Sequence, residues 1–221
     1  MTPEALAHLR RRCAVMRRLI RTHGPCTLVP EPGRSPFESL VRAVAHQQLN
    51  GTAAESILGR FRALFPRRRF PSAAQLADVT DESLRACGFS RAKSAALRDI
   101  AAKTLDGTIP TSRAIRAMSD GEIIARLVQV RGVGRWTVEM LLIFKLGRPD
   151  VFPSDDFGVR NGFRIAHGLA ELPKPKDLLA HAARWRPHGT TAAWYLWRAA
   201  DAAKEKRPIA GVNASPLPIG K

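Results

Sequence analysis

A chain of 221 residues is long enough for one large domain, or for two small lobes that share a core. Hydrophobic residues make up 45% of it, which excludes a wholly disordered chain, and no apolar run reaches the length of a membrane span. Lysine and arginine number 36 against 19 aspartates and glutamates. The formal net charge of +17 makes nucleic acid the first candidate partner.

The positive charge has a second explanation, which composition alone does not separate from the first. Arginine greatly outnumbers lysine, as a GC-rich genome would favour, and this bias would raise the charge without any nucleic-acid partner. The three cysteines, Cys13, Cys26 and Cys87, are scattered, without a CxxC pair or a Cys/His cluster. They support no disulfide framework, zinc site or four-cysteine iron–sulfur cluster, and they fit a reducing, cytoplasmic compartment.

The spacing of apolar residues predicts an all-α fold of many short to medium helices. The N-terminus reads as one amphipathic helix of the mature protein, because Leu6, Leu9 and Met16 recur at helical spacing with arginines on the other face. Gly, Pro, Ser and Asp separate the further helices. These are predicted near residues 37–48, 52–64, 73–76, 81–87, 88–105, 112–118, 120–130, 135–146, 155–167, 175–182 and 189–204.

No strand pattern, internal repeat or Pro/Ser-rich linker divides this string of helices. We therefore expect one helical domain over residues 1–204. Residues 205–221 are rich in proline and glycine, and we expect them to form a flexible tail.

The most specific local pattern is a pair of amphipathic helices joined by the glycine turn RGVG, over about residues 120–146. Glycines in this turn would permit positive φ and let the backbone approach a ligand closely, while Val133 would bury its side chain. The free N–H groups at the start of the second helix would bind an anion. Such contacts hold DNA phosphates without reading bases. An ordinary helix pair with a glycine cap is the plainer alternative.

Two neighbouring carboxylates follow in the segment VFPSDDFGVR, residues 151–160. A helix is predicted to start here, and its macrodipole would favour a negative charge at this place. Spacing alone does not choose between Asp155 and Asp156, and both could be simple capping residues.

The hairpin VRGVGRWTVEML, a short Gly/Pro loop and the segment DVFPSDDFGVRNGF together resemble the helix-hairpin-helix–Gly/Pro–Asp (HhH-GPD) superfamily of DNA glycosylases. The match is closest to its 3-methyladenine DNA glycosylase II branch. LVRAVAHQQLNGTAAESILGRF, GFSRAKSAALRDIA and RWRPHGTTAAWYLWRAAD extend the resemblance, in order, over about residues 37–201. The chain has no room for the additional β-rich domain of the bacterial two-part members, so it resembles the compact form. The resemblance implies a two-lobed helical fold with the active-site cleft between the lobes.

The resemblance also selects a catalytic residue. In the family the second aspartate of such a pair is catalytic, which is Asp156 here, and Ser154 or Asp155 is then the expected helix cap. The carboxylate would stabilise the positive charge that develops on the sugar as the base departs, and would orient or deprotonate water.

Aromatic residues are expected around the extruded base. By resemblance Trp136 and Trp197 line the pocket, where an indole face suits a cationic alkylated purine. Tyr195 would line the same pocket or simply pack, whereas Trp185 and Trp194 are expected in the core.

Further residues are expected to contact the duplex. Gln48, Leu49 or Asn50 would fill the gap that the extruded base leaves, although a buried leucine between solvated amides is an equal alternative. The phosphate contacts would come from Gly132, Val133, Gly134, Arg135 and Thr137 in the hairpin, and from Ser90, Arg91 and Lys93 in the segment FSRAK. A solvated basic helix start is the alternative for the last three.

The expected reaction is hydrolysis without strand cleavage. Family members that also cut the strand carry a lysine two residues after the last hairpin glycine, and Trp136 takes that place here. The resemblance implies action on damaged double-stranded DNA, away from membranes and at the nucleoid if the source is bacterial. A monomer is the default for a protein that scans DNA. The resemblance also implies no organic cofactor and no Fe–S cluster, with Na⁺ or K⁺ on the backbone carbonyls of Val128, Val130 and Val133.

Two rival functions stay open. One is a related glycosylase for deaminated, oxidised or mismatched bases. The other is a catalytically silent DNA-binding module, against which Asp156 and the two pocket tryptophans argue, since pure binding needs neither.

Overall fold

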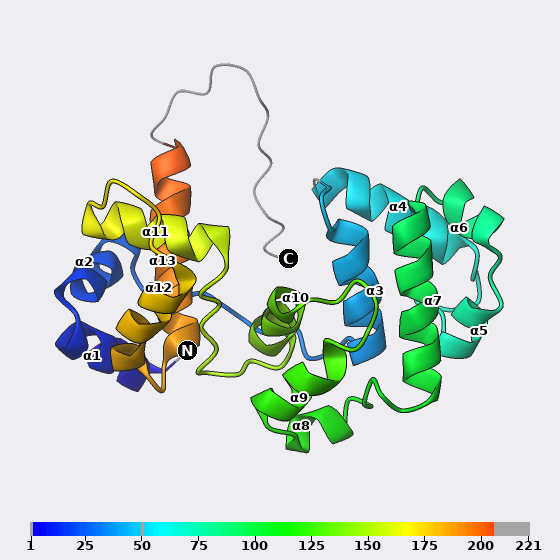
Figure 1. The fold of residues 1–221 in the computed structure, drawn as a ribbon, viewed down its shortest axis with the longest axis horizontal. Helices are drawn as coiled ribbons and strands as arrows, with labels where there is room; N and C mark the ends of the chain where they lie inside the picture. The colour runs from blue at the N-terminus through cyan, green and yellow to red at the C-terminus, as the bar shows by residue number, and fades with distance from the viewer. Residues whose placement is uncertain (1, 50, 206–221) are drawn as a thin grey trace. The chain divides into compact units, whose positions relative to one another are not determined.

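The computed structural model describes residues 2–49 and 51–205. Over those residues every regular element is helical and none is a strand, which confirms the predicted all-α fold (Figure 1). No helix within these ranges is long and apolar enough to cross a membrane. The expected flexible tail falls outside the described residues, apart from Glu205 at the end of the last helix.

The chain divides into two compact helical units. Among the described residues, the first unit combines 2–31 with 142–205, and the second comprises 32–49 and 51–141. The first crossing lies in the Pro- and Gly-rich loop before residue 36. The second carries no linker signal in the sequence, because it lies inside the helical stretch that the apolar spacing predicted near 135–146.

In the first unit the N-terminal segment forms two helices, α1 (Pro3–Arg12) and α2 (Ala14–His23). The expectation of a single helix was wrong, because the backbone of Cys13 is extended, with φ −153° and ψ 119°. The break redirects the chain so that Leu9, Met16 and Ile20 are all buried. The apolar residues were therefore identified correctly, and only the continuity of the helix was missed.

The rest of the first unit contains α11 (Phe157–His167), α12 (Pro175–Ala182), the 3₁₀ turn η2 (Ala183–Trp185) and α13 (Gly189–Glu205). Helices α11 and α13 pack against each other, and Gly162 makes this approach possible (Figure 1). A Cβ atom on Gly162 would lie 1.9 Å from the carbonyl oxygen of Leu196. The two helices that carry Asp156 and Trp197 are thus held in backbone contact.

The second unit contains α3 (Pro36–His46), α4 (Gly51–Ala63), α5 (Ala73–Ala77), α6 (Asp81–Ala86), α7 (Arg91–Leu105), α8 (Ala114–Ala117), α9 (Asp120–Leu127) and α10 (Arg135–Met140). After α10 the chain continues as a π-helical turn, η1 (Leu141–Lys145). Ser35, Ser72 and Ser90 accept N–H bonds from the first turns of α3, α5 and α7. These local caps explain why the predicted helix starts agree closely with the structure.

Candidate functional site

Asp156 is itself the cap of α11. Its Oδ1 accepts a hydrogen bond of 2.8 Å from the N–H of Val159, three residues later. The prediction that Ser154 or Asp155 caps this helix was wrong, because the helix starts later than expected and Asp156 has the extended ψ of 125° that a cap requires. Asp155 is exposed. The two carboxylates therefore have different surroundings in the structure, and this distinguishes Asp156 from Asp155. The spacing of residues in the sequence could not distinguish them.

A second donor fixes the same carboxylate oxygen. Trp197 Nε1, from α13, donates to Asp156 Oδ1 at 2.8 Å. The ring of Phe144 stacks on the indole of Trp197, with centroids 5.7 Å apart and planes 26° from parallel, and Phe144 is 44% exposed. The first unit thus presents an oriented carboxylate at a helix N-terminus beside an aromatic pair. This arrangement can stabilise a positive charge that develops next to it.

Gly158 leaves room for this arrangement. A Cβ atom there would lie 2.8 Å from Cδ1 of Trp197 and 3.1 Å from Oδ1 of Asp156. Sequence reasoning missed both Gly158 and Phe144. A glycine in the first turn of a helix, two residues after an acidic pair, was the available signal for Gly158, because glycine is otherwise costly in a helix. Phe144 had no local signal, since its partner Trp197 lies 53 positions later in the chain.

Tyr195 belongs to the core and not to a base pocket. Its side chain has no exposed surface, and its hydroxyl donates to the carbonyl of Gly24 at 2.8 Å. Burial raises the pKa of Tyr195 to about 12, so the phenol stays protonated. The assignment of Tyr195 to the base pocket is corrected accordingly, and its packing alternative is supported. Trp185 and Trp194 are buried, which confirms their expected place in the core.

The hairpin turn, residues 131–134, joins α9 to α10 in the second unit. Gly132 has φ 77°, which confirms the need for glycine there, and the Val133 side chain is buried with its N–H bonded to Val130 O at 3.0 Å. The expectation of a positive φ was wrong for Gly134, whose φ is −88°. A Cβ on Gly134 would meet nothing within 4 Å. Glycine at this position therefore leaves open space beside the backbone, and it is not needed for an unusual backbone conformation.

The residues after the hairpin turn differ in accessibility. Trp136 is 46% exposed, so part of its side chain is accessible to a ligand and is not buried in the core. The side chain of Arg135 is also exposed and forms an ion pair of 2.9 Å from Nε to Oε1 of the buried Glu139. Thr137 is buried, which leaves its backbone, and not its side chain, as the group that could face a ligand.

The segment after α3 forms the 47–49 turn, whose side chains at Gln48 and Leu49 are exposed. Exposure removes the alternative in which the leucine is buried. Gln48 has φ 57°, a left-handed conformation that costs a non-glycine residue about 1–2 kcal/mol. Asn50, the third candidate for the gap, lies outside the described residues. Gln47 Nε2 donates to the carbonyl of Gly132 at 2.8 Å, so the 47–49 turn is tied to the hairpin turn.

The start of α7 carries the other predicted phosphate contacts. Ser90 and Arg91 are exposed, and Ser90 Oγ accepts the N–H of Lys93. Lys93 itself points inward, since its Nζ donates to the carbonyls of Ala45 at 2.9 Å and Gln47 at 2.8 Å. Partial burial lowers the pKa of Lys93. Its assignment as a phosphate contact is corrected, because two backbone carbonyls already hold the ammonium group.

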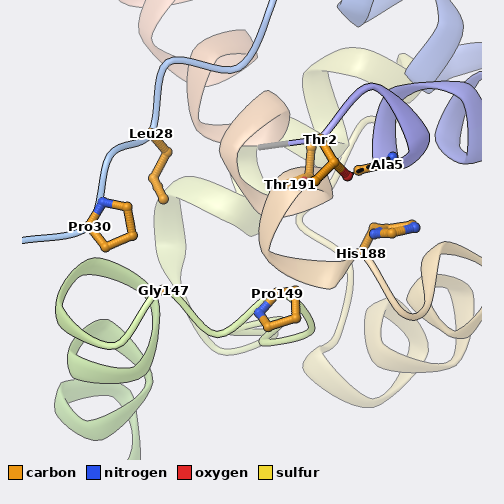
Figure 2. A pocket seen from close by; sticks show the side chains of 8 residues that line it. All are labelled: Thr2, Ala5, Leu28, Pro30, Gly147, Pro149, His188 and Thr191. Atoms are coloured by element: carbon orange, nitrogen blue, oxygen red, sulfur yellow. Dashed lines mark hydrogen bonds between the residues drawn. The ribbon is translucent and has the colours of Figure 1, made fainter. Parts of the chain in front are cut away.

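A separate cavity of about 240 Å³ lies in the first unit, between α1, the segment before residue 31, the 147–149 loop and the start of α13 (Figure 2). Figure 2 shows Leu28 and Pro30 on one side and His188 and Thr191 on the other. None of the predicted site residues lines this cavity. The predicted chemistry therefore does not take place there.

The structure brings Asp156, Trp197 and Phe144 together within the first unit. Within the second unit it brings together the hairpin turn, the 47–49 turn and the start of α7. Trp136 belongs to the second unit and Trp197 to the first. The active-site cleft expected between two lobes stays a prediction.

Comparison with known proteins identifies a family whose members are similar to this chain in sequence. The model of the HhH-GPD superfamily of base excision DNA repair proteins matches residues 41–188. DNA-3-methyladenine glycosylase 1 of Schizosaccharomyces pombe is 44% identical over 176 residues, which cover 80% of this chain and 77% of that protein.

Two solved structures have similar folds. The S. pombe 3-methyladenine DNA glycosylase in complex with abasic DNA superimposes with a TM-score of 0.79 at 42% identity, covering 88% of this chain and 95% of that one. A DNA-3-methyladenine glycosidase from Bacillus halodurans gives 0.82 at 31% identity, with 93% and 92% covered. The chain belongs to the HhH-GPD superfamily of base excision DNA repair proteins.

Proposed function

We propose that this chain is a monofunctional DNA glycosylase of the 3-methyladenine type, which extrudes alkylated purines from duplex DNA and hydrolyses the N-glycosyl bond. The observation that carries the proposal is the Asp156 carboxylate, oriented by Val159 and Trp197 at the start of α11. The names of the relatives support the substrate class, and the abasic DNA bound to one of them corresponds to the product of this reaction.

Asp156 would act on the charge that appears in the sugar. The bond between C1′ and the purine nitrogen breaks with both electrons leaving on the base. An alkylated purine carries a positive charge and so departs as a neutral base, without a general acid. The sugar gains oxocarbenium character, which the Asp156 carboxylate stabilises. Water then bonds to C1′ and gives up a proton, leaving an abasic site in an intact strand.

The exposed aromatic rings supply the surface for the base. A cationic purine gains stacking and cation–π attraction on an aromatic face, worth about 0.5–2 kcal/mol. Trp136 and Phe144 have the exposed rings, and Trp197 offers its indole next to Asp156. We assign Phe144 and Trp197, both of the first unit, to the base pocket, and the assignment of Trp136 stays the prediction made from the family resemblance.

The second unit supplies the DNA contacts in this proposal. The protein acts as a monomer. Phosphates of double-stranded DNA are bound by the backbone of the hairpin turn together with Ser90, Arg91 and Arg135. Gln48 or Leu49 enters the stack where the base has left. By the family resemblance, a structural Na⁺ or K⁺ would be held by the backbone carbonyls of Val128, Val130 and Val133, since hard cations take oxygen ligands.

Base release is the test. The protein is incubated with duplexes that carry 7-methylguanine, 3-methyladenine, 1,N6-ethenoadenine or hypoxanthine, and the free base is measured by chromatography. We expect release of the alkylated purines, and no covalent adduct after borohydride reduction, since no lysine occupies the position of Trp136. Binding without release of any base would support the silent DNA-binding module. Release of hypoxanthine alone would support the glycosylase for deaminated bases.

A further inference from the structure

The end of α3 is held by a residue from another helix. Near this end, the carbonyl of Val44 accepts the N–H of Gln47, and the carbonyl of His46 accepts the N–H of Leu49 at 3.3 Å. The carbonyl of Ala45 instead accepts from Lys93 Nζ, which also reaches the carbonyl of Gln47. A cation at a helix C-terminus is favourable, because unpaired carbonyls and the macrodipole place negative charge there.

The turn that follows needs such support. Helices commonly end with a glycine in the left-handed conformation, but here Gln48 occupies it, with φ 57°. A non-glycine residue in this conformation persists when its surroundings hold it in place. The bond from Lys93 Nζ to the carbonyl of Gln47 holds the residue directly before Gln48. Lys93 thus fixes the backbone from which the exposed Gln48 and Leu49 side chains project.

The same face of α7 also holds the hairpin turn. Asp99 Oδ2 accepts the N–H of Arg131 at 2.7 Å, and a Cβ on Gly132 would lie 3.1 Å from Cβ of Ala96. Lys93, Ala96 and Asp99 recur every three residues, so they follow one side of the helix over about 9 Å. Helix α7 lies against α3 in the second unit (Figure 1). Gln47 closes the connection through its bond to Gly132 O.

We propose that Lys93 is a positioning residue, which with Gln47 holds the 47–49 turn at a fixed place relative to the hairpin turn so that base extrusion is efficient. This inference rests on the proposed function, because the turn matters only if the protein opens duplex DNA. Lys93 does not bind phosphate in this account. Its loss slows the opening of the base pair and leaves the electrostatic attraction to the duplex unchanged.

Two properties separate a positioning role from a phosphate contact. Each phosphate contact contributes about 0.9 to the slope of log K against log salt concentration. Removing Lys93 should leave this slope unchanged, whereas removing the exposed Arg91 in the same turn should lower it by about one. Extrusion also costs less when the base is mispaired. A defect in opening should therefore shrink on a lesion placed in a mismatch.

The test compares Lys93→Met, Lys93→Arg and Gln47→Leu with the wild type, and uses Arg91→Met as the matched control. Single-turnover release of 7-methylguanine is measured from a paired and from a mispaired duplex, together with the salt dependence of binding to undamaged duplex. We expect Lys93→Met and Gln47→Leu to slow release about 10-fold or more on the paired duplex, and much less on the mispaired one. Lys93→Arg should recover most of the rate, since it keeps the cation.

Three results would overturn the proposal. They are a salt slope reduced by about one in Lys93→Met, an equal rate loss on both duplexes, or an unchanged rate on the paired duplex. Failure of the proposed function is seen separately, as a wild type that releases no base. In that case amide hydrogen exchange still tests the tether. Faster exchange at Gln47 and Leu49 in Lys93→Met supports it, and unchanged exchange refutes it.

Discussion

Gly158 makes the carboxylate–indole contact testable by adding a single methyl group. In Gly158→Ala the new Cβ would lie 2.8 Å from Cδ1 of Trp197, 3.2 Å from its Nε1 and 3.1 Å from Oδ1 of Asp156. To reach an ordinary contact of about 3.4 Å, the indole must move by about 0.6 Å. This movement displaces the ring that donates the 2.8 Å bond to the carboxylate.

The expected loss follows from that displacement. A misplacement of about 1 Å costs about 100-fold in rate, so about 0.6 Å should cost about 10-fold. Stability should fall by no more than about 2 kcal/mol, because the roughly 1 kcal/mol that alanine gains over glycine in a helix offsets part of an overpacking cost of about 1–3 kcal/mol. Single-turnover base release measures the first effect, and urea unfolding measures the second.

Gly121→Ala is the matched control. Gly121 is the second residue of α9, as Gly158 is of α11, and a Cβ there would meet nothing within 4 Å. We expect Gly121→Ala to keep the wild-type rate and to gain up to about 1 kcal/mol of stability. A wild-type rate in Gly158→Ala, or an equal loss in both variants, would refute the role assigned to the contact.

Four further outcomes are expected. Gly162→Ala should lower the free energy of unfolding by about 3 kcal/mol or more in urea, because its Cβ would collide with the backbone of Leu196, and a change under about 0.5 kcal/mol would contradict this. Gly134→Arg should weaken binding to damaged and undamaged duplex by the same factor, about 10-fold or more, in a fluorescence-anisotropy titration; a lesion-specific loss would argue against its backbone contact. Gln48→Gly should raise stability by up to about 1 kcal/mol while slowing base release, and an unchanged rate would show that this side chain is not used. Burial, followed by neighbouring positive charge, lowers the pKa of His181 to about 4, so the unfolded chain binds its proton first and stability should fall as pH drops from about 6.5 towards 4; thermal unfolding in His181→Gln should depend less on pH over that window.

Local signals were enough to locate most helices. Ser35, Ser72 and Ser119 lie directly before apolar-periodic segments, and each caps the helix that the sequence predicted there. The N-terminal segment was the exception. Its apolar spacing continues through Cys13 without a break, although the backbone does not, because burial of both helices decides the direction of the chain.

The candidate site could be predicted only in part from the sequence, because its geometry depends on contacts between residues that lie far apart in the chain. A shift of two residues at the start of α11 decides that Asp156 caps the helix, and no propensity resolves so small a difference. Lys93 reads as a surface cation at a helix start, yet its two acceptors lie 46 and 48 residues earlier. Tyr195 lies on a helix buried on nearly all sides, so its sequence context could not separate a pocket wall from the core.

Exchanging each aspartate separately for asparagine tests the central claim most directly. Asparagine also caps helices and keeps an oxygen for Val159 and Trp197, so Asp156→Asn removes the charge and preserves the fold. We predict that Asp156→Asn slows single-turnover release of 7-methylguanine by about 100-fold or more, while Asp155→Asn stays within about 2-fold of the wild type. Wild-type release by Asp156→Asn, or an equal loss in Asp155→Asn, would contradict the account.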